Sequence, residues 1–280
     1  MYNHWDIFIK SALDGIELRH IVEIGADNGK NTKNLLEYCR QKGSRLTTID
    51  CEPSSEVLAF TNTHKDIFTL SDKTSLEALP ELPEYEAILI DGDHNWYTVY
   101  HELKIIENTF AETGKFPLIF LHDIAWPFAR RDMYYSPERI PGRFRHNYSK
   151  KGILPGQPVP IETLGHNAGF CNALHEGGAK NGVLTAVEDF IKESKRTLRF
   201  AIFNGYFGLG LLTSQKTIES FPKLVELFNY MDRSASIGDA MQNMMFETIC
   251  LNYDIYNSRT YKTGKVFQKV FRFFIPRKNV

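Results

Sequence analysis

The sequence predicts an α/β fold, a doubly wound and mostly parallel sheet covered by helices on both faces. Three observations lead to this prediction. Short apolar runs alternate regularly with helical patterns through residue 122. The first apolar run stops at a glycine-containing loop that leads directly into a helix. Near the end of this pattern, the pair Asn204-Gly205 stands between two apolar runs and is typical of a β-hairpin.

The apolar runs and helical patterns give the expected elements in order. Strands are expected near 20–25, 45–50, 66–70, 86–91 and 117–122, and helices near 30–42, 54–61, 73–79 and 94–112. The pattern of residues 181–191 predicts a further amphipathic helix, and the two hairpin strands fall at 198–203 and 207–212. A final antiparallel hairpin fits poorly with an all-parallel dinucleotide-binding sheet.

The 280 residues have room for one elaborated domain or two small ones. We expect a main domain over residues 1–212, with an insertion at 124–182, and a helical C-terminal extension over 213–280. Six prolines and many glycines interrupt the pattern in the insertion, which we expect to be a structureless lid or binding loop over the substrate. The net charge of −1 gives no general attraction to nucleic acid.

The sequence favours a cytoplasmic location. No apolar run approaches the roughly 20 residues of a membrane span, and the N-terminus lacks the regions of a signal peptide. The four cysteines have no C-x-x-C spacing, which argues against a disulfide framework or a thiolate zinc site. The basic, phenylalanine-rich segment 261–280 could contact a membrane surface or a second copy of the chain, but packing on the domain is the favoured interpretation.

The loop after the first strand predicts a ligand site. Gly25 and Gly29 allow close approach of a ligand to the backbone, and the following helix offers free N–H groups at its N-terminus. Asp50 ends the second strand, where an acid can accept hydrogen bonds from a ribose diol. Asp27 replaces the middle glycine of a dinucleotide loop, so a cationic ligand is favoured over a pyrophosphate. The alternative is an ordinary α/β turn without a ligand.

Ionisable residues also follow the fourth and fifth strands. Asp91, Asp93 and His94 follow one, and His122 and Asp123 follow the other. In a doubly wound sheet both ends open onto the same crevice, where repelling carboxylates favour a bound cation. Oxygen ligands suit Mg²⁺, whereas a histidine ligand also suits Mn²⁺, Fe²⁺ or Zn²⁺. Alternatively, Asp93 or His94 caps the next helix, and His122 is only a hydrogen-bonded strand end.

These motifs resemble those of class I S-adenosylmethionine (AdoMet) methyltransferases, whose first motif is E/D-x-G-x-x-x-G. The D-G-D-H run at 91–94, the H-D strand end and several later patterns resemble the "methyltransferase domain 24" group, over about residues 20–212. Those later patterns are R-R-D-M-Y-Y at 130–135, P-E-R-I-P at 137–141 and E-G-G at 176–178. The resemblance implies a Rossmann-like, seven-stranded sheet and metal-assisted O-methylation of small molecules.

The resemblance also implies roles for individual residues. The expected cofactor-binding residues are Glu23, Gly25, Ala26, Asp27, Gly29, Thr32, Asp50, Cys51, Asp72, Lys73 and Asp91. The expected ligands of a divalent metal, Mg²⁺ foremost, are Asp91, His122 and Asp123, with His122 standing where an oxygen ligand is common. The catalytic base is expected to be His94 or Asp93, because a histidine titrates near neutral pH.

The insertion supplies the expected substrate residues, which are Arg130, Arg131, Tyr134 and Glu176. The adjacent arginines could hold a phosphate or carboxylate. The expected activity is therefore AdoMet-dependent methylation of a hydroxyl on a sugar or similar small polar acceptor. The alternatives are a metal-dependent hydroxylase or hydrolase that uses the same acidic cluster, and a binding protein without activity.

Overall fold

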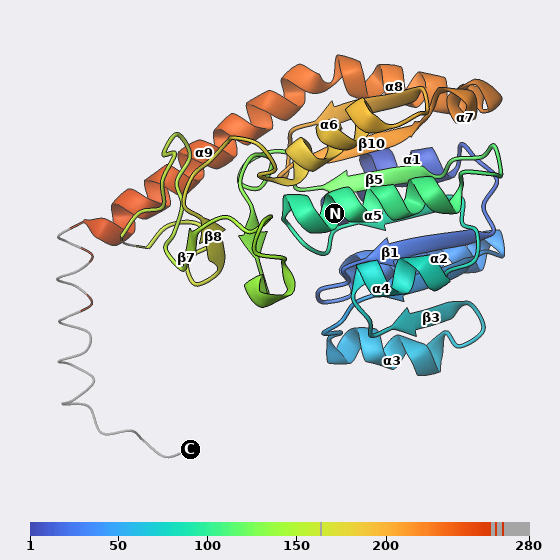
Figure 1. The fold of residues 1–280 in the computed structure, drawn as a ribbon, viewed down its shortest axis with the longest axis horizontal. Coiled ribbons are helices and arrows are strands. Elements are labelled where there is room, and N and C mark those ends of the chain that lie inside the picture. Colours follow the sequence, from blue (N-terminus) through green and yellow to red (C-terminus); the bar gives the residue numbers. More distant parts are fainter. Residues whose placement is uncertain (163, 259–260, 262–264, 266–280) are drawn as a thin grey trace.

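The computed structural model describes residues 1–162, 164–258, 261 and 265. Its centre is a seven-stranded sheet in the order β3-β2-β1-β4-β5-β10-β9 (Figure 1). The strands are β1 (His20–Ile24), β2 (Arg45–Ile49), β3 (Phe68–Ser71), β4 (Ala87–Ile90), β5 (Leu118–His122), β9 (Leu198–Phe203) and β10 (Leu209–Ser214). The first five are parallel, whereas β10 pairs antiparallel with both β5 and β9. The predicted doubly wound sheet with a final hairpin is confirmed.

The strands carry uninterrupted apolar runs because both faces of the sheet are covered. Ile21 and Val22 are adjacent in β1, are both fully buried, and belong to opposite hydrophobic cores. One core includes side chains of α1 (Lys10–Leu13), α2 (Lys30–Lys42), α3 (Ser55–Thr63) and α8 (Pro222–Arg233). The other includes side chains of α4 (Ser75–Ala78), α5 (Trp96–Thr109) and α6 (Val183–Glu193).

A side-chain cap explains where α5 begins. The backbone N–H of Thr98 donates to Asn95 Oδ1 at 2.9 Å, so Asn95 caps α5. The alternative that Asp93 or His94 caps this helix is therefore wrong. Asp93 instead accepts a hydrogen bond from the hydroxyl of Thr98 at 2.8 Å, which leaves His94 available for other contacts.

The insertion contains more regular structure than the sequence indicated. It forms a small antiparallel sheet in the order β6-β8-β7, from Met133–Tyr134, Cys171–Ala173 and Tyr148–Ser149. The expectation of a structureless loop is wrong here, because these strands are only two or three residues long and carry no periodicity that a sequence pattern could reveal.

A buried carboxylate attaches this insertion to the main domain. Asp132 accepts hydrogen bonds from the backbone N–H groups of Trp96, at 2.8 Å, and Gly182, at 2.6 Å. These groups lie at the N-termini of α5 and α6, whose dipoles favour a negative charge. The hydroxyl of Tyr134 donates to the other oxygen of Asp132 at 2.9 Å, so one side chain joins two helices and β6.

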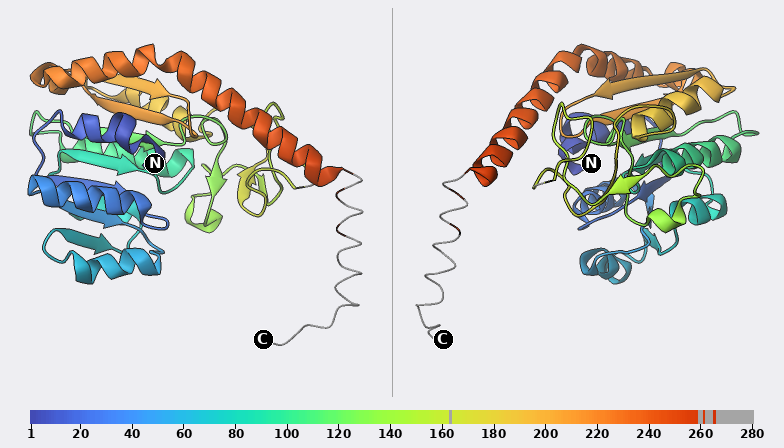
Figure 2. Two further views of the ribbon diagram at one scale, coloured as in Figure 1. Left: turned by 180° about the vertical axis from the view of Figure 1, so that it is seen from behind. Right: turned by 60° about the vertical axis from the view of Figure 1, so that its left-hand side comes forward.

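The C-terminal extension begins with α7 (Gln215–Ser220) and α8, which packs against β9 and α1. The long helix α9 (Ala235–Asn257) then runs past the insertion (Figure 2). Phe246 of this helix packs edgewise against Trp126. The basic segment 261–280, apart from residues 261 and 265, lies outside the described residues. Among the helices that the structure describes, none has the length and apolar character needed to cross a bilayer.

The buried face of α5 carries a glutamate, Glu102, although acidic side chains are rarely buried completely. Glu102 is fully buried, and neither of its carboxyl oxygens has a well-formed hydrogen bond, although the nearby Ser75 hydroxyl favours the ionised form. Burial raises the pKa of Glu102 from its ordinary 4.5 to about 8. Because the folded state favours the protonated form, the stability that this group contributes is complete below about pH 4.5 and is lost as the pH rises through 8.

We therefore expect Glu102→Gln to stabilise the protein at pH 8.5 by about 1–3 kcal/mol, because the neutral amide removes the cost of ionising an acid in the core, and by much less at pH 5. Urea unfolding at the two pH values measures this difference. Glu112→Gln, at an exposed glutamate soon after α5, is the matched control and should change stability equally little at both. A Glu102→Gln effect that does not depend on pH would contradict the assignment.

Candidate functional site

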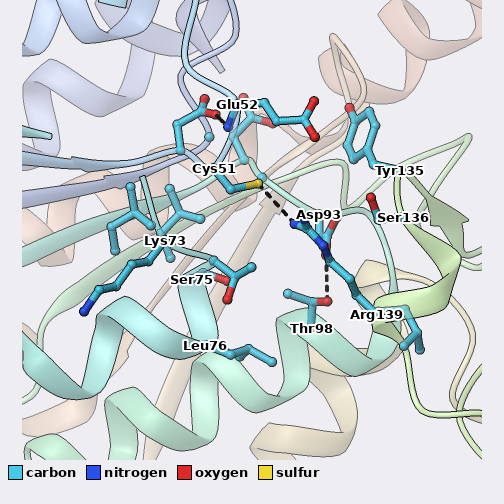
Figure 3. A pocket seen from close by; sticks show the side chains of 18 of the residues that line it. Cys51, Glu52, Lys73, Ser75, Leu76, Asp93, Thr98, Tyr135, Ser136 and Arg139 are labelled. Atoms are coloured by element: carbon cyan, nitrogen blue, oxygen red, sulfur yellow. Dashed lines mark hydrogen bonds between the residues drawn. The ribbon is translucent and has the colours of Figure 1, made fainter. Parts of the chain in front are cut away.

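Two adjoining cavities lie at the carboxyl edge of the parallel strands. The first, of about 460 Å³, is lined by the ends of β1, β2 and β4, by the start of α4 and by the insertion (Figure 3). The second, of about 240 Å³, is lined by the Gly25–Asn31 loop, the N-terminal residues and the strand-end cluster. They share Gly25, Asp27, Asp91 and Tyr135. This edge is where doubly wound sheets bind ligands.

The loop that separates β1 from α2 has a backbone that its glycines make possible. Gly25 has a φ of 81°, and a Cβ built on it would lie 2.3 Å from the carbonyl oxygen of Asp91. Only glycine therefore allows the ends of β1 and β4 to approach this closely. Gly29, with a φ of 76°, is the residue before α2, so the first N–H groups of that helix lie at the loop.

Glu23 supports this loop from behind. Its buried carboxylate accepts hydrogen bonds from Asn31 Nδ2 at 2.8 Å, Thr32 Oγ1 at 2.7 Å and Thr48 Oγ1 at 2.9 Å. Burial raises the pKa of Glu23 to about 7, although the three hydrogen bonds favour the ionised form. Glu23 and Thr32, both predicted to bind the cofactor, line neither cavity and instead fix the backbone that does.

Asp50 joins the β1 loop to the end of β2. Its Oδ2 accepts from the backbone N–H of Ala26 at 2.8 Å, and its Oδ1 from that of Glu52 at 2.9 Å. Among the predicted cofactor residues, Gly25, Asp27, Asp50, Cys51, Lys73 and Asp91 line the first cavity. Asp72 lines neither cavity.

The insertion closes the first cavity with residues that sequence reasoning did not assign. Tyr135, Ser136, Arg139 and Ile140 line it, and the Arg139 guanidinium donates to Cys51 Sγ across the opening at 3.5 Å (Figure 3). The patterns R-R-D-M-Y-Y and P-E-R-I contain three of these residues, but the patterns do not tell which side chains face the ligand.

The predicted metal ligands lie together at the second cavity. The ring nitrogen Nδ1 of His122 lies 3.1 Å from Asp91 Oδ1 and 2.9 Å from Asp123 Oδ2, and ligand atoms of the three residues are within 4.8 Å of one another. Burial alone would lower the pKa of His122, but the two facing carboxylates raise it to about 10. The N-terminal amine of Met1 also donates to Asp91 Oδ2 at 2.9 Å.

The predicted base, His94, is held in one orientation beside this cluster. Its Nδ1 lies 3.2 Å from Asp123 Oδ2, and its ring stacks on Phe128 with the centroids 4.9 Å apart. An ionised carboxylate can only accept, so this short distance favours the tautomer of His94 with its proton on Nδ1. The other nitrogen, Nε2, lies 3.2 Å from the hydroxyl of Tyr135, at the second cavity.

The backbone of Asp123 has an uncommon conformation that lets its carboxylate contact both His122 and His94. Its φ is 58°, a left-handed conformation that is uncommon for residues other than glycine. This conformation places its carboxylate between the two imidazoles, since Oδ2 meets both His122 and His94. Burial would raise the pKa of Asp123, but the two facing imidazoles hold it below its ordinary value.

The four predicted substrate residues are not at either cavity. Arg130 pairs with Glu188 on α6 and donates to its Oε1 at 2.7 Å. Arg131 is fully buried and donates to the backbone carbonyls of Ala173 at 2.6 Å and Pro158 at 2.9 Å, with Glu176 beside it. Tyr134 is buried against Asp132. Their contacts hold the insertion together, which explains why charged and aromatic residues are found there.

Two comparisons concern sequence. Residues 22–124 match the family model Methyltransf_24, whose description is a methyltransferase domain. This segment begins within β1 and ends just after Asp123, so it includes the glycine loop, Asp50 and both groups of strand-end residues. The search of curated proteins found no match to the chain.

Solved structures are similar to this chain at low sequence identity. The SAH-bound methyltransferase PaMTH1 of Podospora anserina is 15% identical, with a TM-score of 0.47 over 75% of this chain and 76% of that one. The 1,6-didemethyltoxoflavin-N1-methyltransferase of Burkholderia thailandensis is 11% identical, with a TM-score of 0.41 over 74% of each chain. The O-methyltransferase NcsB1 of neocarzinostatin biosynthesis is 12% identical, with a TM-score of 0.40 over 76% of this chain and 55% of that one.

Proposed function

We propose that this chain, whose residues 22–124 match the model of a methyltransferase domain, is an AdoMet-dependent O-methyltransferase acting on a hydroxyl of a sugar or similar small polar acceptor. The observation that carries the proposal is the orientation of His94. Its Nδ1 faces the carboxylate of Asp123, and its Nε2 lies 3.2 Å from the hydroxyl of Tyr135. That hydroxyl lies at the second cavity, which the glycine loop also lines. This is the arrangement by which an imidazole removes a proton from an alcohol.

The first cavity suits the nucleoside part of AdoMet. Asp50 already accepts two backbone N–H groups, but a carboxylate has about four acceptor positions and can also receive the ribose hydroxyls. Carboxylates of Asp27, Asp91 and Asp93 line the same cavity. Their negative charge favours a sulfonium cation, which supports AdoMet over a nucleotide with phosphates.

In this mechanism His94 takes the proton of the acceptor hydroxyl, and the buried Asp123 keeps the ring oriented and stabilises the charge that develops on it. The enzyme supplies alignment as well, since the sulfonium itself activates the methyl group. We propose that the insertion, through Tyr135, forms the acceptor-side wall of the catalytic domain 1–212, while Arg139 covers the cofactor cavity and 213–280 is an added helical extension.

A divalent metal fits the cluster of Asp91, His122 and Asp123. Two carboxylates and an imidazole are a common ligand set, and their separation is small enough for one ion to contact all three. A bound metal would polarise the acceptor hydroxyl and lower its pKa. His122 Nδ1 faces both carboxylates, so a metal bound at this nitrogen has to displace its proton.

The cofactor assignment predicts the effect of Asp50→Ala. We expect AdoMet affinity, measured by isothermal titration calorimetry, to fall by about tenfold or more, because charge-assisted hydrogen bonds contribute about 1.5–3 kcal/mol. Asp66→Ala, at an exposed aspartate before β3, is the matched control and should bind AdoMet as the parent does. Equal affinity of both variants would rule out the ribose contact.

The base assignment predicts the effect of His94→Gln. We expect methyl transfer from labelled AdoMet to a panel of sugars and phenols to fall by about 10²–10⁴-fold, the usual contribution of a general base. AdoMet affinity should change little. His64→Gln, away from both cavities, is the control for loss of an imidazole. Turnover that survives in His94→Gln would remove His94 from the mechanism.

The metal assignment predicts binding of Mn²⁺ and Mg²⁺ to protein first treated with EDTA. We expect one site, at least tenfold weaker in Asp123→Asn than in the parent or in Asp66→Asn. Because the pKa of His122 is about 10 and its proton must leave, affinity should rise with pH between 6 and 9. Calorimetry in buffers of different ionisation enthalpy measures the released proton. Binding that is unchanged in Asp123→Asn would place the metal elsewhere.

A further inference from the structure

Tyr135 is the residue whose position the proposed mechanism leaves unexplained. Its hydroxyl lies 3.2 Å from His94 Nε2, the ring nitrogen that must receive the proton of the acceptor. Its side chain comes from the insertion, lines both cavities, and is labelled at the edge of the first one in Figure 3. A hydroxyl of the protein itself thus occupies the reactive nitrogen of the base.

The backbone around Tyr135 is fixed relative to His94. The N–H of Met133 donates to the backbone carbonyl of His94 at 2.9 Å, and the adjacent Tyr134 is buried and bonded to Asp132. The position of the Tyr135 Cα beside the base is therefore set by the sheet and by the buried Asp132 contact. It does not depend on a loose surface loop.

The side chain of Tyr135, in contrast, is half exposed. The residue is 54% accessible, and its ring has edge or tilted contacts with Phe170, at 5.8 Å between centroids, and with His94, at 5.6 Å. An exposed ring of this kind can change its side-chain rotamer within nanoseconds without disturbing the core. The backbone at Tyr135 is thus fixed, whereas its hydroxyl can leave His94 Nε2 by a change of rotamer.

We propose that Tyr135 holds the place of the acceptor, with its hydroxyl on His94 Nε2 until the hydroxyl of the acceptor displaces it. This inference rests on the proposed role of His94 as the base. The exchange replaces one O–H···N hydrogen bond by another, so it costs little net free energy. It also selects for acceptors, since a ligand without a hydroxyl leaves Tyr135 in place and the base covered.

The reactivity of His94 Nε2 tests this proposal without any acceptor. Diethyl pyrocarbonate acylates unprotonated imidazole nitrogens, and peptide mass spectrometry of the full chain gives the rate at each histidine. We expect His94 in Tyr135→Phe to react about fivefold faster than in the parent, because the lone pair of Nε2 loses its hydrogen bond while the ring remains. His64 in the same sample is the internal standard.

Two further variants test whether the effect is specific to the Tyr135 hydroxyl. Tyr148→Phe, in β7 of the same small sheet, should leave the His94 rate unchanged. The acylation rate of His94 in Tyr135→Ala should be only modestly higher than in Tyr135→Phe. An unchanged rate in Tyr135→Phe overturns the proposal, and so does an increase seen only in Tyr135→Ala, since the ring would then shield His94 sterically. Full turnover in His94→Gln would instead refute the base, whatever the acylation rates.

Discussion

The buried carboxylate of Glu23 makes the contacts on which the cavity-bearing edge of the sheet depends. It lies on β1 and binds side chains of α2 and of β2, so it fixes three segments at one point. A buried acid without these donors would be costly, and the donors would be unsatisfied without the acid. These contacts fix the position of the Gly25–Gly29 loop between β1 and α2, and residues of this loop line both cavities.

Asp132 has the corresponding role for the insertion. By binding the N-terminal N–H groups at α5 and α6, it brings β6 against the backbone of His94. This attachment lies beside the segment from which Tyr135 and Arg139 reach the cavities. A buried structural carboxylate and the chemistry at the strand ends are thus linked through a short stretch of chain.

The two histidines beside Asp123 differ in environment and therefore in role. His122 faces two carboxylates through a single nitrogen, and the raised pKa keeps it protonated as their counter-charge unless a metal takes that position. His94 faces one carboxylate and has its second nitrogen at the cavity. In the proposed mechanism the same residue type is a charge partner in one place and a base in the other, which is how neighbouring groups divide acid and base roles.

The sequence by itself determined the sheet, the glycine loop and the strand-end cluster. These follow from apolar runs, from glycine at positive φ and from the rule that parallel strands end at one edge, all of which are local or topological. Which residues of the insertion face the cavities was decided only by the tertiary structure. Tyr134 and Tyr135 are adjacent and chemically identical, but Tyr134 is buried at the end of β6 whereas Tyr135, just after the strand, is 54% exposed. The buried Asp132 carboxylate accepts the hydroxyl of Tyr134, whereas the hydroxyl of Tyr135 meets His94.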